Sequence, residues 1–112
     1  MLIDQLSAQS NIFSDKDEKI LTVCKYLCKS CTNPAAVILF GSYARGDNRL
    51  TSDLDILLLT NDEIGRDERA ELVSYTDLQD VELVIYTKET FKQSKCLLVE
   101  RIKKEGVILW EA

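Results

Sequence analysis

Residues 40–55, FGSYARGDNRLTSDLD, run directly into the apolar segment ILLL at 56–59. This stretch places Asp53 and Asp55 two residues apart at the start of what the apolar pattern predicts to be a buried strand. An ionised carboxylate is costly to bury unless it is paired or binds a metal ion. The two carboxylates therefore indicate a role beyond packing.

The two-residue spacing predicts a metal site. Alternate side chains of a strand point to the same face, so Asp53 and Asp55 project together while Leu54 and Ile56 enter the other face. Such carboxylates repel each other unless a cation lies between them. Mg²⁺ prefers oxygen ligands and often combines one or two carboxylates with substrate phosphates. With Glu82 near the start of a later strand, the sequence predicts an acidic triad at one end of a sheet.

A glycine and a serine precede the acidic pair and favour phosphate binding. Gly41 and Ser42 follow the first predicted strand directly, so backbone N–H groups and a hydroxyl can face an anion without an intervening side chain. Arg45 and Arg49 add positive charge nearby, and Arg45 can be either a phosphate contact or a surface residue. Neither a Walker A nor a GxGxxG pattern is present.

Apolar patterning predicts an α/β protein of the α+β type, with a small mixed β-sheet flanked by helices. The predicted helices are 15–31, 61–75 and 88–104; the predicted strands are 36–40, 54–60 and 81–86, with an edge strand at 107–110. Residues 1–13 are ambiguous, and a short helix is predicted at 43–45.

Length and charge limit the possible functions. The 112 residues fit a single domain, 1–112, and 14 Lys and Arg against 19 Asp and Glu give a net charge of -5. This balance opposes broad nucleic-acid binding but permits a small anionic ligand at a local cation or metal. Without a basic leader or a membrane-length apolar run, we expect a soluble, cytoplasmic protein with no membrane partner.

Three cysteines have the spacing C-x3-C-x2-C, which resembles the iron–sulfur motif of radical enzymes that use S-adenosylmethionine. We reject that function because Cys24, Cys28 and Cys31 fall with Leu27 on the apolar stripe of the first predicted helix. All three are predicted to be small core residues, and Cys96 in the last predicted helix is interpreted in the same way.

Taken together, Gly41-Ser42, ten intervening residues and Asp53-x-Asp55 match the signature GS-x10-D-x-D. From about residue 36 to residue 112 the chain therefore resembles the minimal nucleotidyltransferases (MNT) of the DNA polymerase β superfamily. The resemblance implies a polymerase β-like fold, a nucleoside triphosphate bound through its phosphates at the Gly-Ser turn, and Mg²⁺ held by the D-x-D pair.

The family also places a third carboxylate on the following strand. Here that position is assigned to Glu82, with Asp80 as a rival. Family members more often have Asp there, so the longer Glu82 departs from the pattern. Poorer geometry at this position is expected to reduce turnover more than nucleotide binding.

The resemblance implies a Mg²⁺-dependent nucleotidyltransferase that moves AMP from ATP to a hydroxyl. Gly41, Ser42 and Arg45 would bind the nucleotide, while Asp53, Asp55 and Glu82 would be both metal ligands and catalytic residues. Minimal members often pair with a helical HEPN ribonuclease in toxin–antitoxin modules, which implies AMP addition to a tyrosine of that partner. The alternative is an antitoxin that neutralises its partner by contact alone. The acceptor, the base preference and homo-oligomer formation stay open.

Overall fold

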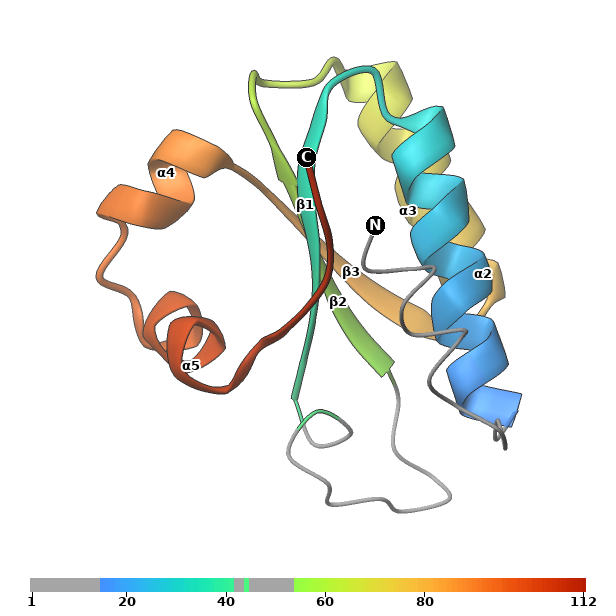
Figure 1. Ribbon diagram of the computed structural model, residues 1–112. Helices are drawn as coiled ribbons and strands as arrows, with labels where there is room; N and C mark the ends of the chain where they lie inside the picture. Colours follow the sequence, from blue (N-terminus) through green and yellow to red (C-terminus); the bar gives the residue numbers. More distant parts are fainter. Residues whose placement is uncertain (1–14, 42–43, 45–53) are drawn as a thin grey trace.

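The computed structural model describes residues 15–41, 44 and 54–112. Figure 1 shows a central sheet with helices on both faces. Along the chain, the described elements are α2 (Asp15–Ser30), β1 (Pro34–Phe40), β2 (Leu54–Thr60), α3 (Arg66–Leu78), β3 (Val81–Thr87), α4 (Lys88–Gln93), α5 (Leu97–Glu105) and β4 (Val107–Glu111). No helix in this part of the chain is long and apolar enough to cross a membrane.

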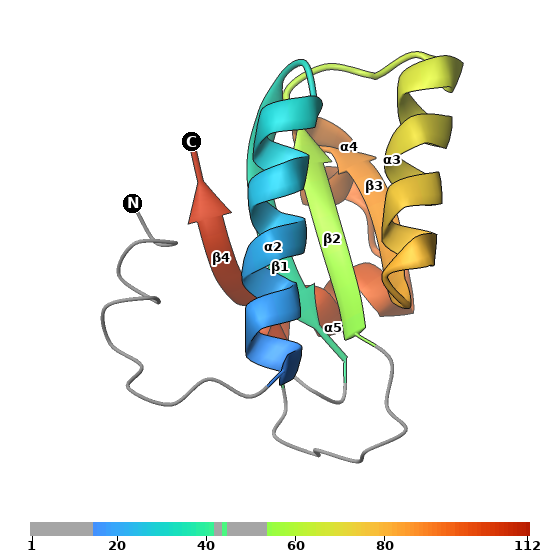
Figure 2. The same cartoon turned by 90° about the vertical axis from the view of Figure 1, so that its right-hand side faces the viewer.

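The four strands form one mixed sheet in the order β3-β2-β1-β4. The strand β1 is antiparallel to both β2 and β4, whereas β2 and β3 run parallel. Helices α2 and α3 cover one face, and α4 and α5 lie on the other (Figures 1 and 2). The end of β1 and the starts of β2 and β3 therefore lie side by side at one end of the strands, which is called the sheet edge below. The predicted α/β class with a small mixed sheet is confirmed.

Burial on both faces explains the unbroken apolar strands. Side chains at alternate positions of β2 enter two separate hydrophobic clusters: Ile56 and Leu58 pack on the α2–α3 side, and Leu57 and Leu59 pack on the α4–α5 side. All the strand predictions fall within two residues of the observed bounds, because an apolar run of this length and composition is typical of a strand covered on both faces.

The first helix confirms the interpretation of three cysteines as packing residues. Cys24 and Cys31 are buried, Cys28 is half-buried, and all three are free thiols. Burial raises the pKa of each of these thiols, which keeps them in the neutral form. They therefore behave as small apolar side chains of α2 and its end.

The second predicted helix begins too early in the sequence. Residues 61–65 form a loop, and α3 starts at Arg66 after Gly65, whose φ of -70° and ψ of 165° are extended. Asn61 and Asp62 are held by Asn33 through backbone and side-chain hydrogen bonds of 2.9–3.1 Å. These contacts to the start of β1 keep the two residues out of the helix.

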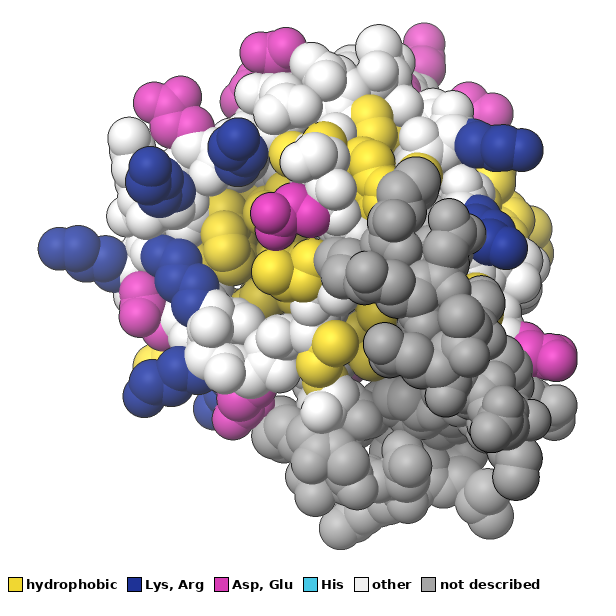
Figure 3. All heavy atoms as spheres, viewed as in Figure 1, with side chains coloured by type: hydrophobic (Ala, Val, Ile, Leu, Met, Phe, Trp, Pro, Cys, Tyr) yellow, Lys and Arg dark blue, Asp and Glu magenta, His cyan; other side chains and the backbone are white. Residues whose placement is uncertain are grey.

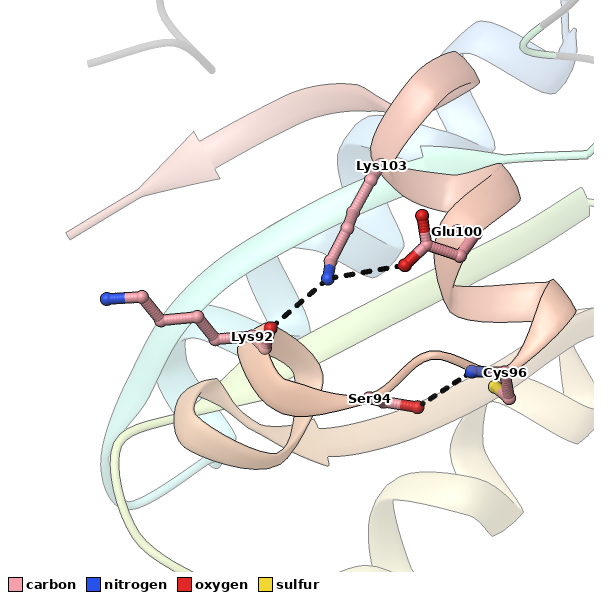
Figure 4. A network of polar contacts seen from close by, with 5 residues as sticks. All are labelled: Lys92, Ser94, Cys96, Glu100 and Lys103. Atoms are coloured by element: carbon pink, nitrogen blue, oxygen red, sulfur yellow. Dashed lines mark hydrogen bonds and ion pairs between the residues drawn. The ribbon is translucent and has the colours of Figure 1, made fainter.

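The predicted helix 88–104 is two helices, α4 and α5, and the prediction that Cys96 is a core residue is wrong. Ser94 has extended backbone angles, and the Cys96 N–H donates to the Ser94 hydroxyl at 3.3 Å, which closes the turn between the helices (Figure 4). Cys96 is exposed at the start of α5. Its pKa is lowered by the Ser94 hydroxyl and by backbone N–H groups of the first turn.

The core supplies a stability prediction. Leu58 in the central strand β2 is fully buried, whereas Leu78 at the end of α3 is 82% exposed. We expect Leu58→Ala to lower the free energy of unfolding by about 2–5 kcal/mol, because it leaves a cavity. Leu78→Ala, the matched control, should change it by less than about 0.5 kcal/mol. Urea unfolding measures both, and equal effects would contradict the observed packing.

A carboxylate on α3 holds the connection between α2 and β1. The Thr32 N–H and hydroxyl each donate to the Glu68 carboxylate at 2.8 Å. Donation by the Thr32 N–H, and then by its hydroxyl, lowers the pKa of Glu68. The folded protein therefore favours the ionised form of the Glu68 carboxyl group.

This contact predicts a pH-dependent stability. Because the pKa of Glu68 is lower in the folded chain, its contribution is present above the ordinary glutamate range and is lost as the pH falls through the lowered value. Glu68→Gln should therefore lower the urea midpoint at pH 7, and this effect should shrink as the pH falls below the ordinary glutamate range. Glu71→Gln, at an exposed site on the same helix, is the control and should show no such pH dependence.

Candidate active site

A cleft opens at the edge of the sheet where β1 ends and β2 and β3 begin. Its volume is about 390 Å³, within the range of roughly 300–1,000 Å³ that is common for small-molecule sites. It is lined by Phe40, Gly41, Asp55, Glu82, Val84, Leu98 and Arg101. Phe40, Asp55, Glu82 and Val84 come from the strands, Gly41 directly follows β1, and the last two residues come from α5, so the cleft lies on the α4–α5 side.

Strand pairing brings two carboxylates together in this cleft. Asp55 is paired with Glu82 across the parallel strands β2 and β3, and with Phe40 across β1. Residues in register on adjacent strands point to the same face, so both carboxylates project toward the α4–α5 side. Asp55 is half-buried and Glu82 is exposed, which leaves both accessible to a ligand.

Gly41 brings the backbone against the Asp55 carboxylate. Its φ of +83° lies in the left-handed region, and a Cβ built there would collide with Asp55 Oδ2 and lie 3.1 Å from Asp55 Cγ. Only glycine satisfies both constraints. The chain can therefore turn at the end of β1 while its backbone stays close to the carboxylate.

The cleft contains three of the six predicted site residues. Gly41, Asp55 and Glu82 line it, whereas Ser42, Arg45 and Asp53 lie outside the described residues, as does the predicted short helix at 43–45 apart from Ala44. Asp80, the rival to Glu82, lies in the turn before β3 with a φ of 59° and does not line the cleft. The assigned roles of all six remain predictions.

The chemistry of the lining side chains fits a hard divalent cation. Asp55 and Glu82 supply carboxylate oxygens, the ligand type that Mg²⁺ takes in preference to nitrogen or sulfur. Within residues 15–41, 44 and 54–112, no group of three Asp, Glu, His or Cys side chains is placed to hold a metal ion. The other ligands of an octahedral Mg²⁺ would be water molecules, phosphate oxygens or Asp53.

Sequence patterns did not identify the α5 wall of the cleft. Leu98 and Arg101 are one helical turn apart, and Arg101 lies 46 positions after Asp55 in the chain. No motif links them to the acidic pair, so the contact depends on how α5 packs against the sheet. The only sequence feature that pointed to this wall of the cleft was the excess of Lys and Arg in residues 88–104.

A smaller cavity lies at the opposite end of the parallel strand pair. Its volume is about 220 Å³, and its lining includes Thr60 of β2, Arg69 of α3 and Thr87 of β3. None of the predicted site residues that the structure describes lines it. Among the described cavities, the Asp55–Glu82 cleft alone is lined by Gly41, Asp55 and Glu82 together.

Comparison with known proteins matches the part of the chain that holds the cleft. The family model described as Polymerase beta, Nucleotidyltransferase matches residues 22–112, which include the whole cleft. No curated protein sequence matches the chain.

Three solved structures illustrate the similarity of fold. A toxin–antitoxin structure with AMP-PNP matches at a TM-score of 0.60 and 24% identity, over 85% of this chain and 73% of that chain. A Sulfolobus solfataricus protein, described provisionally as a nucleotidyltransferase, matches at a TM-score of 0.61 and 21% identity, over 99% of this chain and 88% of that chain. A complex of an MNT antitoxin with a tri-AMPylated HEPN toxin from Shewanella oneidensis matches at a TM-score of 0.61 and 20% identity, over 87% of this chain and 73% of that chain. At these identities the likeness shows a shared fold.

The close approach at Gly41 leads to a testable prediction. Gly41→Ala should destabilise the protein by about 1–3 kcal/mol, because alanine resists a positive φ and its methyl group would displace the Asp55 carboxylate. Gly65→Ala is the matched control, since φ is -70° there and nothing lies within 4 Å of an added Cβ. Thermal and urea unfolding measure both, and a Gly41→Ala protein as stable as the control would show that the turn is not constrained.

Proposed function

Because the chain belongs to the polymerase β nucleotidyltransferase family, we propose that it transfers AMP from ATP to a hydroxyl group on a partner protein. The observation that carries this proposal is the in-register pair of Asp55 and Glu82 beside the constrained turn at Gly41. In that arrangement two carboxylates lie beside a backbone turn that carries no side chain, which supports the binding of a metal–phosphate complex.

In this proposal Asp53, Asp55 and Glu82 hold Mg²⁺, while Gly41, Ser42 and Arg45 hold the triphosphate. The metal supplies charge neutralisation at the phosphates when it is bound. The backbone at Gly41 can approach the triphosphate closely because no side chain intervenes. Asp55 lies on β2, between β1 and β3, and would hold the metal that orients the reacting phosphate.

Glu82 has a second role as the base. The acceptor hydroxyl attacks the α-phosphorus of ATP, the new O–P bond forms, and the bond to the leaving pyrophosphate breaks. The hydroxyl proton moves to the Glu82 carboxylate, whose exposed position on the edge strand β3 leaves it open to an incoming acceptor.

We further propose that the acceptor belongs to a helical HEPN-type toxin and that the chain acts as its antitoxin. Support comes from the similar fold of an MNT antitoxin bound to a tri-AMPylated HEPN toxin. The GS-x10-D-x-D signature of Gly41-Ser42 and Asp53-x-Asp55 points to the same class.

The test incubates the protein with α-labelled ATP, Mg²⁺ and the product of the adjacent gene. We expect label on that partner, no label with Asp55→Asn, and transfer about 10²–10⁴-fold slower with Glu82→Gln, because removing a general base has effects of this size. Asp67→Asn, which changes an exposed carboxylate on α3 outside the cleft, should leave transfer unchanged.

The competing function is neutralisation by contact without transfer, and the Glu82 departure from Asp is the observation that favours it. Growth assays with the partner separate the two. If the Asp53→Asn, Asp55→Asn double variant still neutralises the partner while labelling is lost or never occurs, the contact function replaces the enzymatic one.

A further inference from the structure

We propose that Arg101 of α5 binds the triphosphate of the nucleotide from the side of the cleft opposite the carboxylates. This inference rests on the proposed function and adds a specific residue, from an element outside the GS-x10-D-x-D signature, to the nucleotide site. Its basis is that Arg101 is the only Lys or Arg among the described residues that line the cleft with Asp55 and Glu82.

The position of Arg101 follows from the packing of α5. Val99 and Ile102 are buried on one stripe of this helix, and Leu98 and Arg101 form the adjacent stripe. Lys103 of α5 donates to the backbone carbonyl of Lys92 at 3.3 Å, which braces α5 against α4; it also lies 3.9 Å from Glu100 within α5 itself (Figure 4). A short helix held on two sides can present a side chain to the cleft in a defined position.

Within the part of the chain that the structure describes, the guanidinium of Arg101 makes no ion pair or hydrogen bond. The side chain is exposed, and its five donors are therefore available to a ligand in the cleft. A planar guanidinium binds phosphate oxygens through two parallel hydrogen bonds, a geometry that lysine cannot reproduce.

Charge supports an anionic ligand on this side of the cleft. The chain has a net charge of -5, yet residues 88–105 carry twice as many basic as acidic side chains. Figure 3 shows dark blue Lys and Arg side chains gathered over α4 and α5. The basic residues of this segment are Lys88, Lys92, Lys95, Arg101, Lys103 and Lys104. Arg101 is the member of this group that lines the cleft, so it brings positive charge to the wall that faces the acidic side of the sheet.

Apolar side chains beside Arg101 suit the rest of the ligand. Leu98 is 40% exposed, and with Val84 and Phe40 it gives the cleft an apolar surface between the charged groups. A nucleoside triphosphate combines a base, whose flat aromatic faces pack on apolar side chains, with a polyanionic tail. The cleft offers a surface for each.

The experiment measures the affinity for Mg²⁺·ATP and the transfer rate in parallel for four proteins: wild type, Arg101→Ala, Arg101→Lys and Lys104→Ala. We expect Arg101→Ala to weaken ATP binding by about 10- to 100-fold, the loss typical of removed charge-assisted hydrogen bonds. Arg101→Lys should recover part of this loss. Lys104 is exposed on the same helix and does not line the cleft, so Lys104→Ala should stay within about twofold of wild type.

Each outcome decides one question. Unchanged ATP affinity in Arg101→Ala, with wild type still binding ATP, overturns the role of Arg101 and leaves the proposed function intact. Lost transfer with unchanged ATP affinity also overturns it, because Arg101 would then act on the acceptor. If wild type neither binds ATP nor transfers AMP, the proposed function fails and the role of Arg101 fails with it. Melting temperatures within a few degrees of wild type exclude misfolding as the cause of any loss.

Discussion

The parallel pairing of β2 with β3 is the contact on which the proposed site depends. In this register Asp55 lies directly beside Glu82, so two carboxylates meet at one edge of the sheet. A slip of one residue would turn every side chain of β3 to the other face and remove Glu82 from the cleft. The register is strongly specified because β2 is buried on both sides. The core thus fixes the geometry of the charged groups.

The two helical layers make different contributions. Helices α2 and α3 cover the sheet face opposite the cleft and are joined by a stacked Tyr26–Tyr75 pair, with ring centroids 3.6 Å apart, and by the Glu68–Thr32 contact. Helices α4 and α5 carry basic side chains of residues 88–105, and α5 forms one wall of the cleft. An acidic sheet edge therefore faces a basic helical layer, an arrangement that suits a metal–polyanion complex better than either ion alone.

The sequence predicted the parts of the molecule that depend on local patterns. Unbroken apolar runs identified the strands, and the position of Glu82 near the start of a later strand predicted that it lies at the same end of the sheet as Asp55. Three features depended on tertiary contacts and were missed. The first is the late start of α3, where Asn61 and Asp62 are hydrogen-bonded with Asn33. The second is the break before Cys96, which has no glycine or proline to mark it, and the third is the approach of Arg101 to the cleft. Helical spacing alone could not show that α5 packs over the sheet edge.

The central claim is that a metal–nucleotide complex binds at the Asp55–Glu82 edge, and NMR with Mn²⁺ and ATP tests it most directly. Paramagnetic broadening should first affect the backbone amides of Gly41, Asp55 and Glu82, well before those of Thr60 and Thr87 at the opposite end of the same strands. Uniform broadening, or broadening that begins at Thr60 and Thr87, would contradict the claim.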